Sequence, residues 1–268
     1  MTQDLWNQWQ QDWRRMEALV RRRGWIVREP LTISPPASEA EIAADAEAEG
    51  VPFPTQLREV LTRHSAVIRF DWTIPDELRP VSKMRLPRGG SMRGYIWDLG
   101  NIRKYAISDF LGWKEYLADQ GDGEEPNTPE IWENQFPLAD LCNGDMLTID
   151  VSNPDGPQPV RYFSHELEGL HGRALAPDFF SFVTVLSQLG WAGDTHDDWF
   201  DLVAPEDGDK AYLSLDAKGS RFWRRNRRGE SRTSCCSNHP CTSPTFLHEC
   251  SHRPYSLPWT RTRIGTIL

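Results

Sequence analysis

The stretch from Phe136 to Trp191 constrains the fold of this chain more than any other part of the sequence. Its segment MLTIDV alternates apolar and polar side chains, which is typical of a strand with one buried face. A turn rich in proline follows, and VRYFS then reads as a second strand, so the two predict an antiparallel hairpin. A helix is predicted over residues 178–189, with Gly190 ending it. The pattern provides a packed scaffold without reaction chemistry and favours a protein that binds another protein.

The amino-terminal part predicts a long amphipathic helix over residues 4–23. Trp9, Trp13, Met16 and Val20 follow a 4-3-4 spacing, which places them on one apolar stripe. The segment WIVREPLTI after this helix reads as extended chain.

Two further helices are joined by a stiff connector. Ser38 and Glu41 form a capping box that begins the first of them, and Gly50 ends it. Pro52 and Pro54 stiffen the connector, because each proline restricts its own φ angle and the residue before it. Two half-buried strands, AVIRFDW and GYIWDL, are predicted after the second helix.

The chain carries 39 Asp and Glu against 30 Lys and Arg, and these charges are unevenly distributed. Residues 218–268 hold ten Lys and Arg and two Asp and Glu, so residues 1–217 hold 20 against 37. An acidic body disfavours nucleic acid as a direct partner and favours a basic protein, although the charge is equally consistent with solubility alone. The 12 tryptophans can serve either the core or an interface.

The sequence also bears on the compartment. It has no apolar run near 18 residues and no apolar signal core at its start. Only Cys142 of its five cysteines lies outside residues 235–250. We therefore expect a cytoplasmic protein that contacts no membrane and has no disulfide framework.

The composition changes near Arg224. Residues 224–268 are basic, rich in Ser, Thr, Pro, Cys and His, and nearly free of periodicity, so we expect disorder. The cysteines and histidines are numerous enough to bind zinc, but they lack a CxxC pair. Three interpretations of the tail stay open: a native segment, a metal-binding segment or the product of an altered reading frame. For the protein as a whole we expect neither a metal nor a cofactor.

Other motifs fall short of a catalytic site. HELEGLH has Gly169 where a zinc protease needs its second histidine. Asp145 and Asp150 lie five residues apart on a strand, which points them to opposite faces and disfavours paired acid–base work. A hydrolase using Asp145, Asp150 and His165 would require the three groups to converge in one pocket.

The segment over residues 41–61, with its acidic helix, its glycine and its Pro-x-Pro connector into a second helix, resembles the SUKH superfamily, as do NGDMLTIDV, VRYFSHE and LAPDFFSFVTVL. The resemblance spans about residues 36–192, and FDWTIP and YIWDL fit its middle strands. It implies an α+β fold with a mostly antiparallel mixed sheet and helices packed on one side. The positions that shape the backbone of this fold would be Gly50, Pro52, Pro54, Gly144 and Asp150. We expect an amphipathic helix and linker over 1–35, a SUKH-like domain over 36–223 and the tail over 224–268.

The superfamily includes bacterial immunity proteins that neutralise toxins and fungal regulators of cell-wall assembly. The resemblance implies a non-enzymatic protein that occludes a basic toxin domain, with a regulatory scaffold of the cell-wall type as the alternative. Acidic groups near the middle of the sheet would attract the toxin, and a tryptophan would anchor it, although core packing is the competing interpretation for the tryptophans. The predicted partner-binding residues are Asp71, Trp72, Asp76, Glu77, Trp97 and Asp98.

Overall fold

The computed structural model describes residues 1–43, 53–78, 89–90, 95–103, 107, 110–114, 129–141, 143–165, 169–193, 196–204 and 208–227. The helices are α1 (Gln3–Arg22), α3 (Thr55–Arg63), α4 (Leu99–Asn101), α6 (Phe179–Gln188), α7 (His196–Phe200) and α8 (Ser220–Arg227), with 3-10 helices η1 (Asp76–Leu78) and η3 (Pro129–Trp132). The strands are β1 (Ile26–Ile33), β2 (Val67–Thr73), β3 (Gly89–Gly90), β4 (Tyr95–Asp98), β5 (Gln135–Asp140), β6 (Met146–Asp150), β7 (Val160–Phe163) and β8 (Ala174–Ala176). Nearly all of the basic tail lies outside the described residues.

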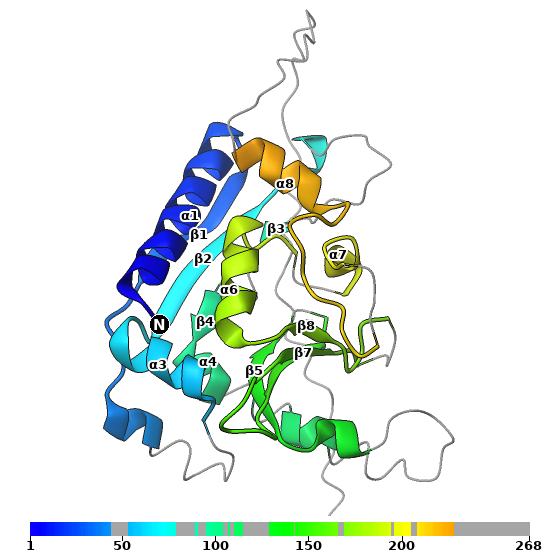
Figure 1. Ribbon diagram of the computed structural model, residues 1–268. Coiled ribbons are helices and arrows are strands. Elements are labelled where there is room, and N and C mark those ends of the chain that lie inside the picture. Colours follow the sequence, from blue (N-terminus) through cyan, green and yellow to red (C-terminus); the bar gives the residue numbers. More distant parts are fainter. Residues whose placement is uncertain are drawn as a thin grey trace, which may run out of the picture. The chain divides into compact units, whose positions relative to one another are not determined.

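The named strands form two antiparallel sheets, which we call sheet A and sheet B (Figure 1). In sheet A, β2 is central, with β1 on one side and β3 and β4 on the other. Sheet B runs in the order β5-β6-β7-β8, and its β6–β7 pair is the predicted hairpin, with Met146 opposite Phe163. The α+β class and the antiparallel pairing are confirmed, but the strands divide between two sheets, whereas the sequence suggested one.

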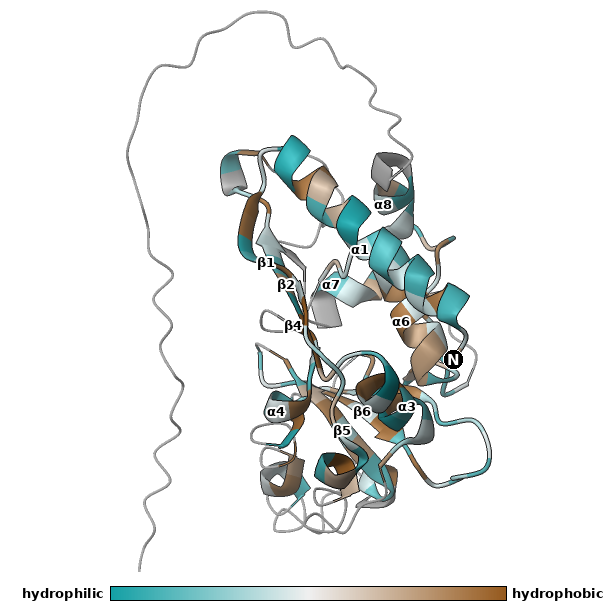
Figure 2. Cartoon of the chain, turned by 90° about the vertical axis from the view of Figure 1, so that its left-hand side faces the viewer, coloured by the Kyte–Doolittle hydropathy of each residue, from teal (hydrophilic) through white to brown (hydrophobic). Residues whose placement is uncertain are grey.

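Helix α1 lies along sheet A and is bonded to α6. Its predicted stripe is buried, and polar and apolar segments alternate along the helix (Figure 2). Two stripe residues donate indole hydrogen bonds: Trp9 Nε1 to Thr184 Oγ1 at 2.9 Å and Trp13 Nε1 to Ser187 Oγ at 2.8 Å. Since both acceptors lie on α6, the amino-terminal helix is part of the same core as the rest of the fold. The boundary between 1–35 and 36–223 stays a prediction.

Tryptophans make up much of the core. Of the eleven in the described part of the chain, Trp25 and Trp113 are half-buried and the other nine are buried. Trp6, Trp9 and Trp13 of α1 meet Trp97 of β4 with ring centroids 5.8 to 6.4 Å apart. Such edge and tilted contacts stabilise aromatic clusters beyond the area they bury. The tryptophan content therefore serves packing in the first place.

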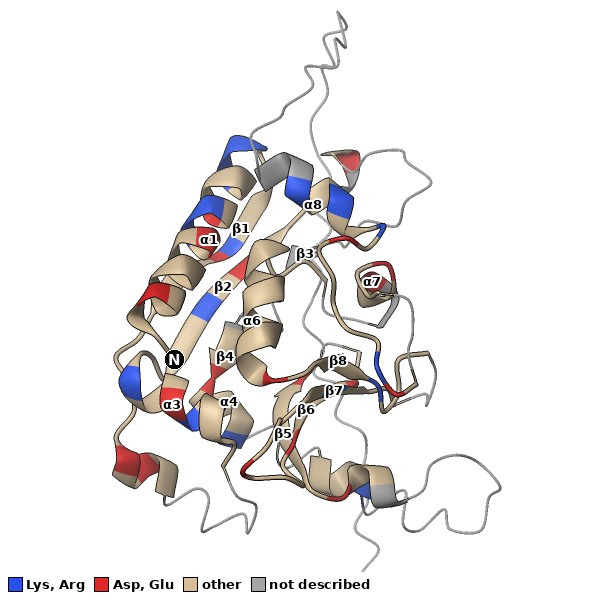
Figure 3. Cartoon of the chain, in the orientation of Figure 1, with Lys and Arg blue, Asp and Glu red and all other residues tan. Residues whose placement is uncertain are grey.

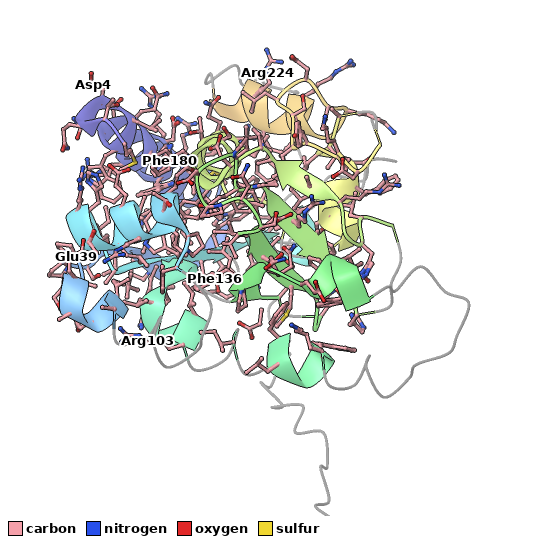
Figure 4. The ribbon with its side chains drawn as sticks, turned by 60° about the horizontal axis from the view of Figure 1, so that its bottom comes forward. Asp4, Glu39, Arg103, Phe136, Phe180 and Arg224 are labelled. Carbon is pink, nitrogen blue, oxygen red and sulfur yellow. The ribbon has the colours of Figure 1, made fainter. Side chains whose placement is uncertain are left out.

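Helix α6 packs against strands of both sheets, β4 of sheet A and β8 of sheet B. Asp178 caps its amino end by accepting a hydrogen bond from Ser181 N at 2.8 Å, and the helix lies within the predicted range 178–189. Phe179 contacts Trp97 of sheet A, and Phe182 contacts Trp199. Figure 4 shows Phe136 of β5 and Phe180 of α6 amid dense side chains, and Phe136 is buried.

Sheet B is covered on both faces. One face joins the main core, and the other packs a second apolar cluster made of Phe110, Trp132, Met146 and Phe163. The resemblance implied helices on one side of the sheet, but in sheet B the second face is covered as well, by the cluster that includes Met146 and Phe163 of the hairpin.

Candidate protein-binding surface

Sheet A has one buried face and one charged face. Along β2, Ile68, Phe70 and Trp72 are buried, and the side chains between them, Arg69 and Asp71, are directed to the opposite face. Figure 3 marks acidic and basic segments close together along β1, β2 and β4. We call this side the charged face of sheet A and define it by Arg28, Arg69, Asp71 and Asp98.

The four charges of this face form two ion pairs. Arg28 Nη1 lies 3.7 Å from Asp71 Oδ2, and Arg69 Nη2 lies 3.4 Å from Asp98 Oδ2. The arginine side chains are more than half exposed, whereas the carboxylates are 18% and 10% exposed. A partner that lands here therefore meets guanidinium groups first, with carboxylates beneath them.

The two predicted carboxylates differ in their structural role. Asp98 also caps helix α4, since its Oδ1 accepts hydrogen bonds from Gly100 N at 2.9 Å and Asn101 N at 3.2 Å. Asp71 is half-buried on the central strand. Replacing Asp98 would disturb a turn as well as a surface, so Asp71 is the cleaner probe of binding.

The predicted tryptophan anchors lie in the core, which corrects that expectation. Trp72 is 0% exposed and donates from Nε1 to Gly190 O at 3.1 Å. Trp97 is 1% exposed and donates to Ser65 O at 3.1 Å. The strand alternation that brings their charged neighbours to the surface turns both indoles inward, so neither ring offers contact area to a partner. Core packing, the competing interpretation, accounts for both.

The remaining predicted binding residues are on η1. Glu77 is exposed, beside the 47% exposed Leu78, and the side chain of Asp76 lies outside the described residues. Sequence reasoning missed Arg28 and Arg69. The signal for Arg69 was available, because it lies between two buried residues of a strand whose alternation was recognised.

The positions predicted to shape the backbone are only partly described. Gly144 has φ +93°, a conformation that side chains disfavour, in the turn before β6. Pro54 is buried and directly precedes α3, while Gly50 and Pro52 lie outside the described residues. The predicted capping box forms, with Ser38 N 2.7 Å from Glu41 Oε2 and Glu41 N 3.2 Å from Ser38 Oγ.

Asp145 organises one end of the hairpin. It is 1% exposed and accepts hydrogen bonds from Asn143 Nδ2 at 2.6 Å, from His165 N at 2.8 Å and from the Tyr162 hydroxyl, and His165 Nδ1 lies 2.6 Å from its Oδ1. Burial alone would raise the pKa of Asp145, but the hydrogen bonds from Tyr162, His165 and Asn143 together outweigh it and lower that pKa. The carboxylate stays ionised and ties the turn before β6 to the end of β7.

Asp150 belongs to a different group at the other end of β6. Its Oδ1 accepts from Ser152 N at 3.0 Å, and its Oδ2 accepts from Arg161 Nε at 3.1 Å. Burial raises the pKa of Asp150, and the bonds to Ser152 and the charge of Arg161 lower it by more. Asp145 and His165 thus meet, but Asp150 bonds elsewhere, so the three groups of the hydrolase hypothesis do not converge.

Within the described ranges, no group of three His, Cys, Asp or Glu side chains is placed to hold a metal ion.

A cavity of about 400 Å³ opens beside Asp150, where β5 begins and β6 ends. Its walls come from the turn before β5, the ends of β6 and β7, and a loop that contains Asp209. Arg161 lines it and donates from Nη1 to Gly172 O at 2.9 Å and to Asp209 Oδ2 at 3.2 Å. We call it the Arg161 pocket, and its further polar lining includes Glu133, Gln135 and Ser152.

Comparison with known proteins places the chain in a family. No curated protein matches it. Among the described residues, no helix has the length and apolar character needed to cross a membrane. The family model of the SMI1 / KNR4 family (SUKH-1) matches residues 36–184, which is more than half of the 268-residue chain. The matched region contains β2, β4, sheet B and most of α6. This chain therefore belongs to the SMI1 / KNR4 family (SUKH-1).

Proposed function

We propose that this protein is a non-enzymatic immunity protein that binds a basic toxin domain in the cytoplasm and occludes it. The observation that carries the proposal is the charged face of sheet A. Its strands are held from behind by buried aromatic side chains, including Trp72 and Trp97, so the charges stand on a stiff support. A preorganised surface loses less conformational entropy when a partner docks.

The charges of the body and of the face have separate roles in this proposal. Residues 1–217 hold 37 Asp and Glu against 20 Lys and Arg, which attracts a basic partner over a distance. The two ion pairs are balanced, because Asp71 and Asp98 each lie against an arginine, and Glu29 of β1 is opposite Asp71 in the register of sheet A. A cationic group of the toxin would replace an arginine as the partner of one of these carboxylates. The face therefore sets the orientation and specificity of docking, whereas the net charge of the body provides the long-range attraction.

The proposal predicts that a gene next to the one for this chain encodes a basic toxin domain, and that domain is used for the test. Expressing that domain should arrest a bacterial host, and co-expressing the full chain should restore growth. The purified pair should run as one complex in size-exclusion chromatography. Arrest that persists with the full chain present, together with separate elution of the two proteins, would contradict the proposal. If a cell-wall synthesis protein then co-purifies with the chain, the regulatory scaffold of the cell-wall type replaces it.

A further inference from the structure

The Arg161 pocket has a volume that can admit one side chain. Ligand pockets in proteins occupy about 300 to 1,000 Å³, and this cavity of about 400 Å³ falls at the small end of that range. Gln135 at the start of β5 and Asp150 at the end of β6 face each other in the register of sheet B. The walls are thus supported by paired strands, which gives the pocket a defined form.

The arginine in the pocket is already engaged. Its Nε donates to Asp150, and its Nη1 donates to both Gly172 O and Asp209. The side chain is only 19% exposed, so the guanidinium is a fixed part of the wall. Its single positive charge is paired with the carboxylates of Asp150 and Asp209, and the carboxylate of Glu133 is a third one in the lining. The pocket keeps a formal surplus of two negative charges.

A buried amide adds a neutral acceptor to these charges. Gln135 is 4% exposed, and its Oε1 accepts from Thr148 Oγ1 at 2.7 Å. A carbonyl oxygen has two lone pairs, so this atom can accept a second hydrogen bond from a ligand. The lining therefore offers both carboxylates and a directional acceptor to a group with several N–H donors.

The same features exclude other ligand classes. An anion would meet the surplus of negative charge. A divalent cation needs six or so oxygen ligands at close range, and among the described residues no group of three His, Cys, Asp or Glu side chains converges to supply them. An organic cation with several N–H donors satisfies the carboxylates and the amide oxygen together.

We propose that the Arg161 pocket receives a lysine or arginine side chain of the protein partner. The identity of the occupant as a side chain rests on the proposed function, in which the partner is a protein. The pocket contributes a contact in addition to the charged face of sheet A. Asp209 and Glu133 at the exposed rim bind the incoming cation, and Gln135 orients it from within.

The test uses a probe that does not require the toxin. Nα-acetyl-arginine amide, which carries one positive charge, is titrated into the isotope-labelled full chain, and NMR follows the Arg161 Nε, the Gln135 side-chain amide and the Gly172 amide. We expect saturable shifts of these three signals in the millimolar range, typical of a single ion pair with a few hydrogen bonds. Nα-acetyl-citrulline amide, the neutral analogue, should not shift them. Absent shifts, or equal shifts with both probes, would overturn the proposal.

Two variants separate the pocket from the rest of the surface. Asp209→Asn changes a side chain that is 61% exposed, so the fold is retained, and it should weaken probe binding by about tenfold, as expected for one hydrogen bond to a charged group. Asp216→Asn is the matched control, because Asp216 is also an exposed carboxylate paired with an arginine, Arg224. Equal affinities in the Asp209 variant and the unmodified chain would contradict the proposal. The probe titration does not depend on toxin rescue. If the probe does not bind, the proposed function still stands, and if the toxin is not neutralised, the titration still reports whether the pocket binds a cation.

Discussion

Trp13 donates its indole hydrogen to Ser187 Oγ at 2.8 Å, and this bond joins α1 to the last turn of α6. The region matched by the family model ends at residue 184, so both residues lie outside it. The tryptophan is 0% exposed and the serine 2%. A buried hydrogen bond therefore ties together two helical residues that lie on either side of the matched region.

Ser187→Ala should destabilise the protein. It removes the acceptor of the Trp13 indole and leaves a buried N–H without a partner, which costs about 1 to 3 kcal/mol. Equilibrium unfolding in urea measures the change. Gln188→Ala, at the next position of the same helix, is the control and should change the free energy of unfolding by less than about 0.5 kcal/mol. Equal effects of the two substitutions would mean that the bond does not stabilise the fold.

Trp97→Ala should reduce stability far more than it reduces binding by the folded protein. The indole is 1% exposed and packed among the α1 tryptophans, so its removal leaves a cavity that costs about 3 to 5 kcal/mol. Arg69→Ala, on the charged face of the neighbouring strand, should cost no more than about 1 kcal/mol. Thermal unfolding of both variants distinguishes them. A Trp97→Ala protein as stable as the unmodified chain would show that the ring is not part of the core.

Asp145→Asn should remove part of the acid sensitivity of the protein. The hydrogen bonds of Tyr162, His165 and Asn143 hold the pKa of Asp145 below its ordinary value of 3.8, so its ionised form stabilises the folded state. This contribution is complete above the unfolded-state pKa and is lost as the pH falls through the lower folded-state pKa. Urea unfolding at a series of pH values should therefore show a shallower loss of stability below about pH 4 in the variant, from a lower plateau at neutral pH.

The control for that prediction is Asp216→Asn, whose side chain is 90% exposed. It should keep the acid-dependent slope of the unmodified chain. Tyr162→Phe removes one of the donors to Asp145 and should give an intermediate slope. Identical slopes in the unmodified chain and Asp145→Asn would show that this carboxylate does not govern acid stability.

Asp71→Asn should weaken toxin binding, provided the charged face is the docking surface. It removes one carboxylate and leaves the charge of Arg28 uncompensated, so a basic partner should associate more slowly, with affinity lower by about threefold to tenfold. Surface plasmon resonance at two salt concentrations resolves the association rate and its salt dependence. Glu39→Gln removes the carboxylate of a surface ion pair with Arg58 and serves as the control, with rates unchanged. Identical kinetics in both variants would exclude the charged face.

Local periodicity carried the predictions that succeeded. The stripe of α1, the helix that became α6 and the hairpin of β6 and β7 are each specified within one short segment, and all three form. Strands β5 and β8 were not predicted. β5 contains Pro137 and is buried along its whole length, so it shows no alternation, and β8 has three residues.

The candidate sites were less accessible from sequence. Alternation places Trp72 and Asp71 on opposite faces of the strand. The prediction that Trp72 and Trp97 contact the partner was wrong, because both side chains face the core. The Arg161 pocket brings together Glu133, Asp150 and Asp209, which are up to 76 residues apart. Only the tertiary fold makes such a group visible.

The bonds from α1 to α6 have a practical consequence for how this protein is handled. A fragment cut to residues 36–184 would lose Trp9, Trp13 and Ser187, and it would present the aromatic side chains of β4 and α6 to water. Exposed apolar surface of that kind promotes aggregation. Expression and crystallisation should therefore use a chain that keeps Thr2, which caps α1, and continues beyond α8, because buried contacts join both flanks of the matched segment to its core.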